Sequence, residues 1–269
     1  MEILYTIIVF MYGLLLGSFY NVVGYRLPNN ISIVRPGSFC PKCKHELKWY
    51  ELIPVLSFII QGGKCRKCKC KISLFYPFIE LTTGILFATS YLIFGFSLEF
   101  VIGLLASSFL VIVIVSDFNY LIISDEVTLF FSIVSILFQL VLGGWQLALS
   151  SVLFGAFLFF LMYFIMLLGN KIMQEEALGG GDVKLMFFVG TVLNVINPIE
   201  LLTIKSYWCL TNGFFELFLS SCLALPFALA SRCLKNGRVI PFGPFILLSL
   251  VIMFFVSFNF LDFIKYFIY

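Results

Sequence analysis

The sequence predicts an all-α polytopic membrane protein with about eight transmembrane helices and one polar loop between the first two. Of its 269 residues, 61% are hydrophobic, 12% are charged and 34 are Phe, and the mean hydropathy is +1.08. Soluble domains are about 45–50% apolar and about 25% charged. This apolar excess excludes a soluble enzyme. It also excludes a disordered chain, because disorder requires low hydrophobicity and high charge.

Apolar runs near the length of about 20 residues that crosses a bilayer set the expected elements. The first run, 3–23, lacks the basic start and cleavage site of a signal peptide, so we expect an uncleaved helix. The others lie at 76–96, 98–116, 127–142, 146–169, 184–195, 206–231 and 242–262. Seven spans are the alternative, because 184–195 is short and the break at Gly144-Trp145 between the fourth and fifth runs is only a few residues long. The expected domains are residues 1–24, the polar "Cys loop" at 25–75 and a seven-helix membrane domain at 76–269.

The positive charges predict the orientation. Ten of the 17 Lys and Arg residues lie between Arg26 and Lys71, together with only two acids, Glu46 and Glu51. A basic loop beside apolar spans is first a topology signal, so we expect no nucleic-acid partner. If the Cys loop is cytoplasmic and eight spans alternate, 15 of the 17 positive charges are cytoplasmic, the additional ones being Lys171, Lys184, Arg232, Lys235 and Arg238. Both termini of this multi-pass chain then face outward.

The Cys loop contains two C-x-x-C pairs, Cys40/Cys43 and Cys65/Cys68. Each pair can present two thiolates from one tight turn, and two such turns make the tetrahedral sulfur site that structural Zn²⁺ prefers. The reducing cytoplasm disfavours disulfides. We therefore expect zinc at these four residues. Free or redox-active thiols are the alternative, and Cys70 could replace Cys68 as a ligand.

Carboxylates at the cytoplasmic ends of spans are the candidate catalytic groups. The single histidine, His45, leaves little scope for a Ser-His-Asp triad or a His-based metal hydrolase. Asp117 ends the third span and Asp182 precedes the sixth, so the topology places both at the same membrane boundary. Two adjacent carboxylates share a proton and can act as the acid and the base of an aspartic protease. Solvated helix ends are the structural alternative for both.

Several neighbouring residues have candidate supporting roles. Three glycines, Gly179, Gly180 and Gly181, would let a substrate backbone approach Asp182. Lys184 could steer substrate or neutralise the site, and Asp125 competes with Asp117 as the partner of Asp182. Glu80 begins the second span and should face protein or water, since an acid is costly in lipid. Glu216 lies inside the seventh run without an evident partner.

These residues also carry a family resemblance. The chain resembles the bacterial type IV prepilin peptidases, bifunctional leader peptidases and N-methyltransferases of the GxGD type. The matching stretches run in family order over almost the whole chain, at 17–28, 40–54, 65–68, 72–73, 76–80, 117, 125–128, 179–184 and 240–244. Ser124 stands where the family usually has Pro, and Gly180 where it often has Ala. Neither departure alters a carboxylate.

The resemblance implies that Asp117 and Asp182 cleave type IV prepilin or pseudopilin precursors at the cytoplasmic face of the plasma membrane. It also implies N-methylation of the new terminus from S-adenosylmethionine, with the 17–28 stretch, the Cys loop and Glu80 as candidate sites. Two alternatives differ in class. A presenilin-like or signal-peptide-peptidase-like protease would have Tyr where this chain has Ser116, and would lack the Cys loop. A non-enzymatic zinc-bearing scaffold or transporter would need more polar groups within its spans.

Overall fold

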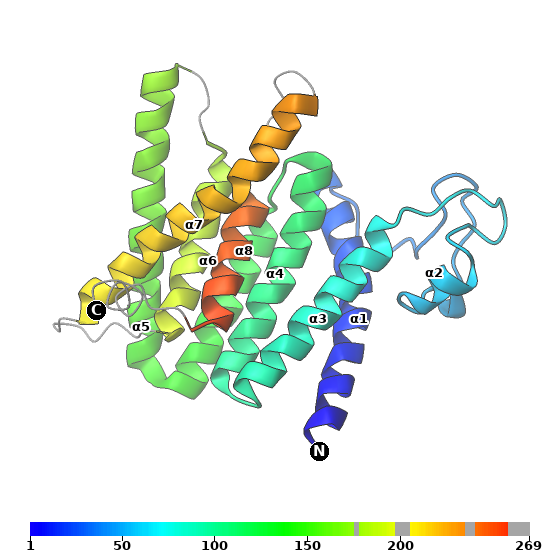
Figure 1. The fold of residues 1–269 in the computed structure, drawn as a ribbon, viewed down its shortest axis with the longest axis horizontal. Coiled ribbons are helices and arrows are strands. Elements are labelled where there is room, and N and C mark those ends of the chain that lie inside the picture. The colour runs from blue at the N-terminus through cyan, green and yellow to red at the C-terminus, as the bar shows by residue number, and fades with distance from the viewer. Residues whose placement is uncertain (175–177, 197–204, 235–239, 258–269) are drawn as a thin grey trace.

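The computed structural model describes residues 1–174, 178–196, 205–234 and 240–257, and within these ranges it contains helices but no strand (Figure 1). This confirms the predicted all-α class. Lys235 and Arg238, two of the charges used for the orientation, lie outside the described residues. The α-helices are α1 Glu2–Arg26, α2 Leu56–Ile60, α3 Phe75–Phe94, α4 Leu98–Tyr120, α5 Asp125–Met173, α6 Gly180–Ile196, α7 Lys205–Leu234 and α8 Gly243–Phe255, with short 3-10 turns η1 Leu27–Asn29 and η2 Trp49–Glu51.

Five helical stretches among the described residues are long and apolar enough to cross a membrane. They are Glu2–Asn29, Phe75–Phe94, Leu98–Tyr120, Gly143–Ile172 and Thr211–Ala230. Helix α8 is equally apolar but shorter. The chain is thus a multi-pass membrane protein, and the first three predicted spans agree with α1, α3 and α4 to within a few residues.

The predicted fourth and fifth spans form one element, α5, which folds back at Gly144. This residue has φ 83°, a conformation that glycine adopts without the penalty that a side chain would bring. Ser151 hydrogen-bonds to Gln139, 12 residues earlier. In a straight helix these residues would be about 18 Å apart, since each residue adds about 1.5 Å. The Gly144-Trp145 divider therefore marks a reversal of direction.

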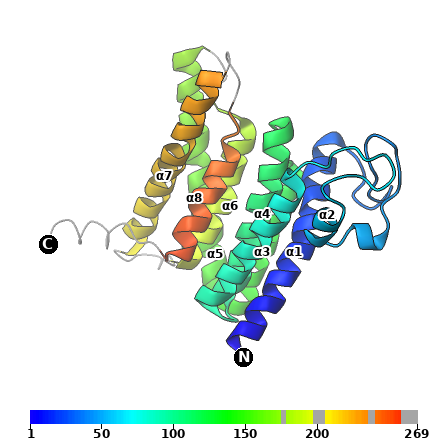
Figure 2. The same cartoon turned by 45° about the vertical axis from the view of Figure 1, so that its right-hand side comes forward.

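Helix α4 occupies the middle of the bundle, between α3 and α1 on one side and α8 and α6 on the other (Figure 2). Its fully buried Phe109 stacks on Phe131 of α5 and meets Phe188 of α6 edge-on, with ring centroids 5.0 and 4.9 Å apart. On the other side α1 approaches α3 closely, because a Cβ on Gly13 would lie 2.7 Å from the Cα of Gly84. These contacts fix where the ends of α4 and α6 lie.

Several polar side chains inside the bundle are paired. Gln139 donates to the carbonyl oxygen of Thr191 at 3.1 Å, and Asn194 donates to Ser151 at 2.8 Å, which joins both halves of α5 to α6. Glu216, for which the sequence suggests no partner, accepts a 2.7 Å hydrogen bond from Ser249 of α8. Buried polar groups require such partners, so these bonds hold the C-terminal helices in register.

Candidate functional site

Asp117 lies in the last turn of α4. Leu121 closes the helix in a left-handed conformation and donates its backbone N–H to the carbonyl oxygen of Asp117 at 2.9 Å. The Asp117 side chain is 5% exposed, and its Oδ2 atom has no hydrogen-bond partner among the described residues. A buried carboxylate oxygen without a partner is costly and therefore suggests a chemical role.

Asp182 lies in the first turn of α6, directly after the three glycines. Its backbone N–H donates to the carbonyl oxygen of Gly179 at 3.1 Å, so the glycines form the turn that starts the helix. A Cβ on Gly180 would have no neighbour within 4 Å, which leaves open space beside the turn. Asp182 is 8% exposed, and its position at a helix N-terminus favours a negative charge.

The fold brings Asp117 and Asp182 together although 65 residues separate them. Their carboxyl groups interact electrostatically across the ends of α4 and α6. The backbone N–H of Gly243, at the start of α8, is directed at the Asp117 carboxyl group. A Cβ on Gly243 would lie 2.7 Å from Ile123 Cδ1 and 3.3 Å from Asp117 Oδ2. The family resemblance includes Gly243 in the 240–244 stretch, but sequence reasoning assigned it no role.

Asp125 and Lys184 are not part of this buried pair. Lys184 Nζ lies 2.7 Å from both carboxylate oxygens of Asp125, and both side chains are largely exposed. The ion pair joins the start of α5 to the start of α6. Asp125 therefore faces Lys184 rather than Asp182, and Lys184 does not neutralise either buried aspartate.

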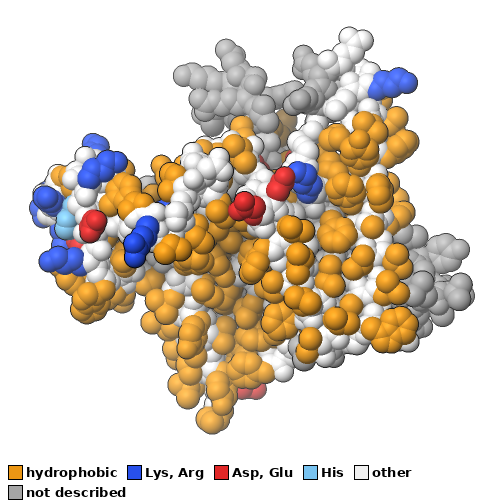
Figure 3. All heavy atoms as spheres, turned by 180° about the vertical axis from the view of Figure 1, so that it is seen from behind, with side chains coloured by type: hydrophobic (Ala, Val, Ile, Leu, Met, Phe, Trp, Pro, Cys, Tyr) orange, Lys and Arg blue, Asp and Glu red, His pale blue; other side chains and the backbone are white. Residues whose placement is uncertain are grey.

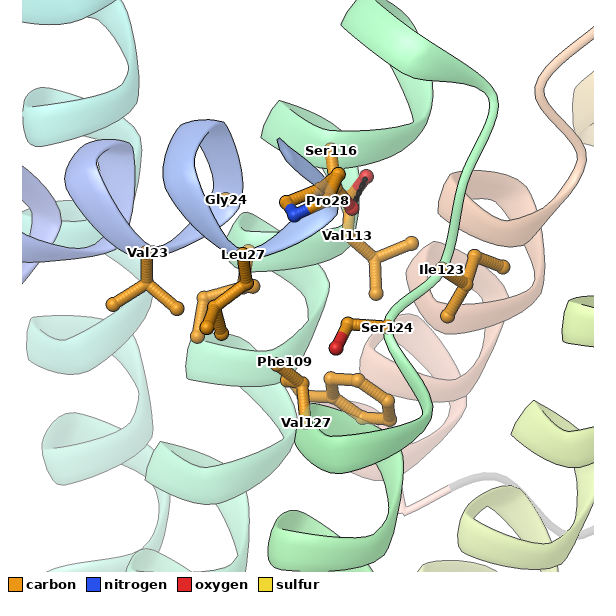
Figure 4. Close-up of a pocket in the computed structure, with 11 residues that line it drawn as sticks. Val23, Gly24, Leu27, Pro28, Phe109, Val113, Ser116, Ile123, Ser124 and Val127 are labelled. Carbon is orange, nitrogen blue, oxygen red and sulfur yellow. Dashed lines mark hydrogen bonds between the residues drawn. The ribbon is translucent and has the colours of Figure 1, made fainter. Parts of the chain in front are cut away.

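The end of α1 lines a small cavity that also reaches the last turns of α4 (Figure 4). Leu27 and Pro28 line it from one side, and Ser116, which precedes Asp117, lines it from α4. Its volume is about 10 Å³, room for about one water molecule. The Leu-Pro sequence that follows α1 thus packs against the helix end that carries Asp117.

The four predicted cysteine ligands lie together in two turns of the same local structure. Lys44 N–H donates to Cys40 O, and Lys69 N–H donates to Cys65 O, each at 2.9 Å. Both lysines have left-handed backbone, with φ of 55° and 58°. The second turn therefore repeats the first with a shift of 25 residues.

The geometry of the four sulfur atoms fits a tetrahedral metal site. All lie within 4.8 Å of one another, and Cys40–Cys68 and Cys43–Cys65 are separated by 3.8 and 3.9 Å. Zn–S bonds of about 2.3 Å in a tetrahedron give S–S distances of about 3.8 Å. Backbone hydrogen bonds from Cys43 and Lys42 lower the pKa of the Cys40 thiol to about 6, whereas burial and the neighbouring thiols raise the pKa of Cys43 to about 11, so the clustered thiols lose their protons one after another.

Cys70 stands at the second-turn position that His45 occupies in the first. Its sulfur lies 3.6 Å from that of Cys40, but Cys70 is not part of the set of four mutually close thiols. The repeat therefore favours Cys68 over Cys70 as the fourth ligand. The sequence signal for this assignment was the repeated C-x-x-C-Lys pattern.

Glu51 ties the two turns together, a role that sequence reasoning missed. Its buried carboxylate accepts the Lys48 backbone N–H at 2.9 Å and lies 3.3 Å from His45 Nε2 and 4.0 Å from Arg66 Nε. The Lys48 hydrogen bond, together with His45 and Arg66, keeps the pKa of Glu51 below its usual value. His45 follows the first cysteine pair and Arg66 lies within the second, so one carboxylate bridges both.

Glu80 connects the Cys loop to the helices. Its Oε2 accepts the backbone N–H of Val55 at 2.7 Å, and Ser18 of α1 also hydrogen-bonds to it. Nearby Asn21 donates to backbone oxygens of both α1 and α3, while its own Oδ1 has no partner among the described residues. Glu80 thus faces protein, as the sequence predicted.

Comparisons with known proteins identify the family of this chain. Residues 11–94 match the bacterial peptidase A24 N-terminal domain, and residues 104–229 match the type IV leader peptidase family. A "Prepilin leader peptidase/N-methyltransferase" of Bacillus subtilis is 38% identical over 70% of this chain and 73% of its own length. A Vibrio cholerae protein of the same name is 32% identical over 95% of this chain and 98% of its own length. No solved structure matches the chain.

Proposed function

The chain belongs to the type IV leader peptidase family, and from this premise we propose how it cleaves and methylates its substrate. It removes the leader peptide of prepilin-like precursors and N-methylates the new terminus, as the names of its relatives indicate. Membership of a peptidase family argues against a non-enzymatic scaffold or transporter. It also favours a leader peptidase over a presenilin-like protease. We propose which residues cleave the substrate, which side of the membrane the active site faces and which residues hold Zn²⁺ and S-adenosylmethionine.

Asp117 and Asp182 form the peptidase pair. The observation that carries this proposal is the electrostatic interaction between two buried carboxyl groups from different helices, one of which has an oxygen without a partner among the described residues. Two such groups share one proton. The ionised carboxylate takes a proton from an attacking water molecule, and the protonated one donates to the oxygen of the scissile carbonyl. The protonation state belongs to the pair and not to either residue.

The surrounding backbone positions the reaction. The Gly243 N–H holds the Asp117 carboxyl group, and the open space beside Gly180 lets an extended substrate backbone approach Asp182. The exposed Asp125–Lys184 pair keeps the starts of α5 and α6 together at this opening.

The active site faces the cytoplasm. Fifteen of 17 positive charges fall on the side that carries the Cys loop when the predicted spans alternate. Asp117 and Asp182 lie at the helix ends on that same side. The N-terminus lies at the opposite end of α1, and the alternation places the C-terminus with it. The membrane is the plasma membrane, and the substrates are type IV prepilin or pseudopilin precursors.

Zn²⁺ is the metal of the Cys loop, held by Cys40, Cys43, Cys65 and Cys68. Its role is structural, because four cysteine ligands leave no open position for a substrate or water. The adjacent lysines and arginines offset the negative charge of the four thiolates. The site stabilises the loop that Glu80 attaches to α1 and α3.

S-adenosylmethionine would supply the methyl group for the new terminal amine. A cationic donor requires a carboxylate or unpaired oxygen, and the junction of α1, α3 and the Cys loop offers both in Glu80 and Asn21 Oδ1. These residues fall in the stretches that the family resemblance marks. Glu80 and Asn21 would hold the donor, and the nearby Cys loop would cover it.

One assay tests the proposal. The purified protein is incubated with a prepilin-type precursor and S-adenosylmethionine, and the products are analysed by mass spectrometry. We expect cleavage after the residue that precedes the apolar segment, and a mass increase of one methyl group on the new terminus. A precursor that stays intact under all conditions would contradict the peptidase assignment.

A further inference from the structure

The Cys loop exposes an apolar surface on and around α2. Trp49 is 78% exposed and Ile59 68%. We call the exposed apolar side chains of this segment the α2 patch, which consists of Trp49, Leu52, Ile53, Leu56, Ile59 and Ile60. So many large apolar side chains next to one another are unusual on a surface that faces water. The patch needs an occupant that the described residues do not supply.

The patch faces the same environment as the membrane helices. In Figures 1 and 2, α2 lies within the Cys loop at the side of the helix bundle. In these views it is drawn lower than the start of α3. Figure 3 shows hydrophobic side chains along the lower edge of the loop and Lys and Arg side chains around its outer part. The first turn of α3 also exposes two large apolar side chains, Tyr76 and Phe78. The α2 patch therefore continues the lipid-facing surface of the helices.

A groove next to the patch combines apolar and cationic groups. It has a volume of about 360 Å³ and is lined by Tyr50, Ile53, Ser57, Ile60, Gln61 and Arg66. The Arg66 guanidinium lies 4.9 Å from the centre of the Tyr50 ring, and about half of this side chain is exposed. An apolar wall with one guanidinium suits a molecule that has an acyl chain and a phosphate.

We propose that the α2 patch inserts into the cytoplasmic leaflet of the same bilayer and that an anionic phospholipid occupies the groove. The phosphate lies at Arg66 and the acyl chain lies along Ile53 and Ile60. Trp residues concentrate at membrane interfaces, and basic residues attract anionic lipid, so Trp49 and the ten Lys and Arg residues of the loop favour this occupant. The loop is then held on two sides, by lipid at α2 and by Glu80 at Val55.

Trp49 is a reporter for this insertion. The full-length protein with Trp145→Phe and Trp208→Phe keeps Trp49 as its only tryptophan, and is reconstituted in nanodiscs with or without brominated acyl chains. Bromine quenches nearby tryptophan, so we expect the brominated lipid to remove most of the Trp49 emission. Ile59→Glu combined with Ile60→Glu should restore it. Val34→Glu changes an equally exposed apolar residue outside the patch and should leave the quenching intact.

The groove is tested in nanodiscs in which only one lipid class is brominated. At equal mole fractions, brominated anionic lipid should quench Trp49 more than brominated zwitterionic lipid, and Arg66→Gln should remove the difference. Lys67→Gln, the next residue in the same turn, should keep it. Zinc content reports that each variant is folded.

Three results would overturn the proposal. Unquenched Trp49 in brominated nanodiscs would show that the patch does not enter the bilayer. Quenching that a saturating prepilin peptide relieves would identify substrate, rather than lipid, as the occupant. If brominated anionic and zwitterionic lipids quench Trp49 equally in the protein that retains Arg66, the proposed phosphate site at Arg66 is wrong. None of these readouts depends on cleavage or methylation.

Discussion

The aspartate pair and the Cys loop are built in opposite ways. Asp117 and Asp182 are 65 residues apart and meet only because α4, α5 and α6 pack around shared aromatic side chains. The four cysteines lie within 29 residues, in two turns that local backbone hydrogen bonds shape. One site depends on the whole bundle and the other on a short segment and its metal. Substitutions should therefore separate them.

The largest expected effect follows from removing either carboxyl group. Asp117→Asn or Asp182→Asn should each reduce leader cleavage by about 10³-fold or more, because residues that act as a unit lose most of the activity when one is removed. Zinc content should not change. Cleavage is measured by mass spectrometry of the precursor, and metal content by atomic spectroscopy.

The control for these variants is methyl transfer to a pre-cleaved pilin. We expect it to survive in both, because Glu80 and Asn21 belong to α3 and α1 and hydrogen-bond to Val55 and to backbone oxygens of those helices, whereas the two aspartates belong to α4 and α6. Retained cleavage in either Asn variant would contradict the pair. Loss of methyl transfer together with cleavage would show that the two activities share a site.

The next effect concerns the metal. Structural zinc contributes about 10–16 kcal/mol when four ligands bind it, so the loss of one ligand removes a large part of its affinity. Cys43→Ser should therefore lower bound zinc well below the stoichiometric amount and make the loop sensitive to proteolysis. Cys70→Ser is the matched control and should keep its zinc. Full zinc in Cys43→Ser, or loss of zinc in Cys70→Ser, would change the ligand assignment.

Gly243→Ala should act on the aspartate pair alone. The added Cβ would lie 2.7 Å from Ile123 Cδ1 and 3.2 Å from Leu185 Cδ1, and such overpacking costs about 1–3 kcal/mol. We expect cleavage to fall about 10-fold through displacement of Asp117, with zinc unchanged. Gly37→Ala, where a Cβ would meet nothing within 4 Å, should leave both properties as they are. Wild-type cleavage by Gly243→Ala would show that α8 does not position Asp117.

The contrast also explains what the sequence could predict. Regular spacing predicts local structure, so the C-x-x-C turns, the first spans and the helix-end positions of Asp117 and Asp182 followed from it. Contacts between distant segments have no such signal. The approach of Gly243 to Asp117, the bond from Ser249 to Glu216 and the Glu51 bridge depend on helix packing or loop folding. The sequence showed only a short break between two apolar runs at Gly144. Two adjacent glycines are compatible with a bend or with a loop, so the reversal of direction could not be predicted.

The smallest expected effect is at the exposed pair beside the aspartates. Surface ion pairs contribute about 0.2–1 kcal/mol, and more than half of the Asp125 side chain and about half of the Lys184 side chain are exposed. Lys184→Ala and Asp125→Asn should therefore each change cleavage by only a few-fold, and the double variant should be no worse than either single variant. Because salt screens exposed charges, the difference from the wild type should shrink at high ionic strength. Cleavage rates at low and high salt measure this. A loss of cleavage in Asp125→Asn as large as in Asp117→Asn would contradict the supporting role of Asp125 and place it in the catalytic site with Asp182.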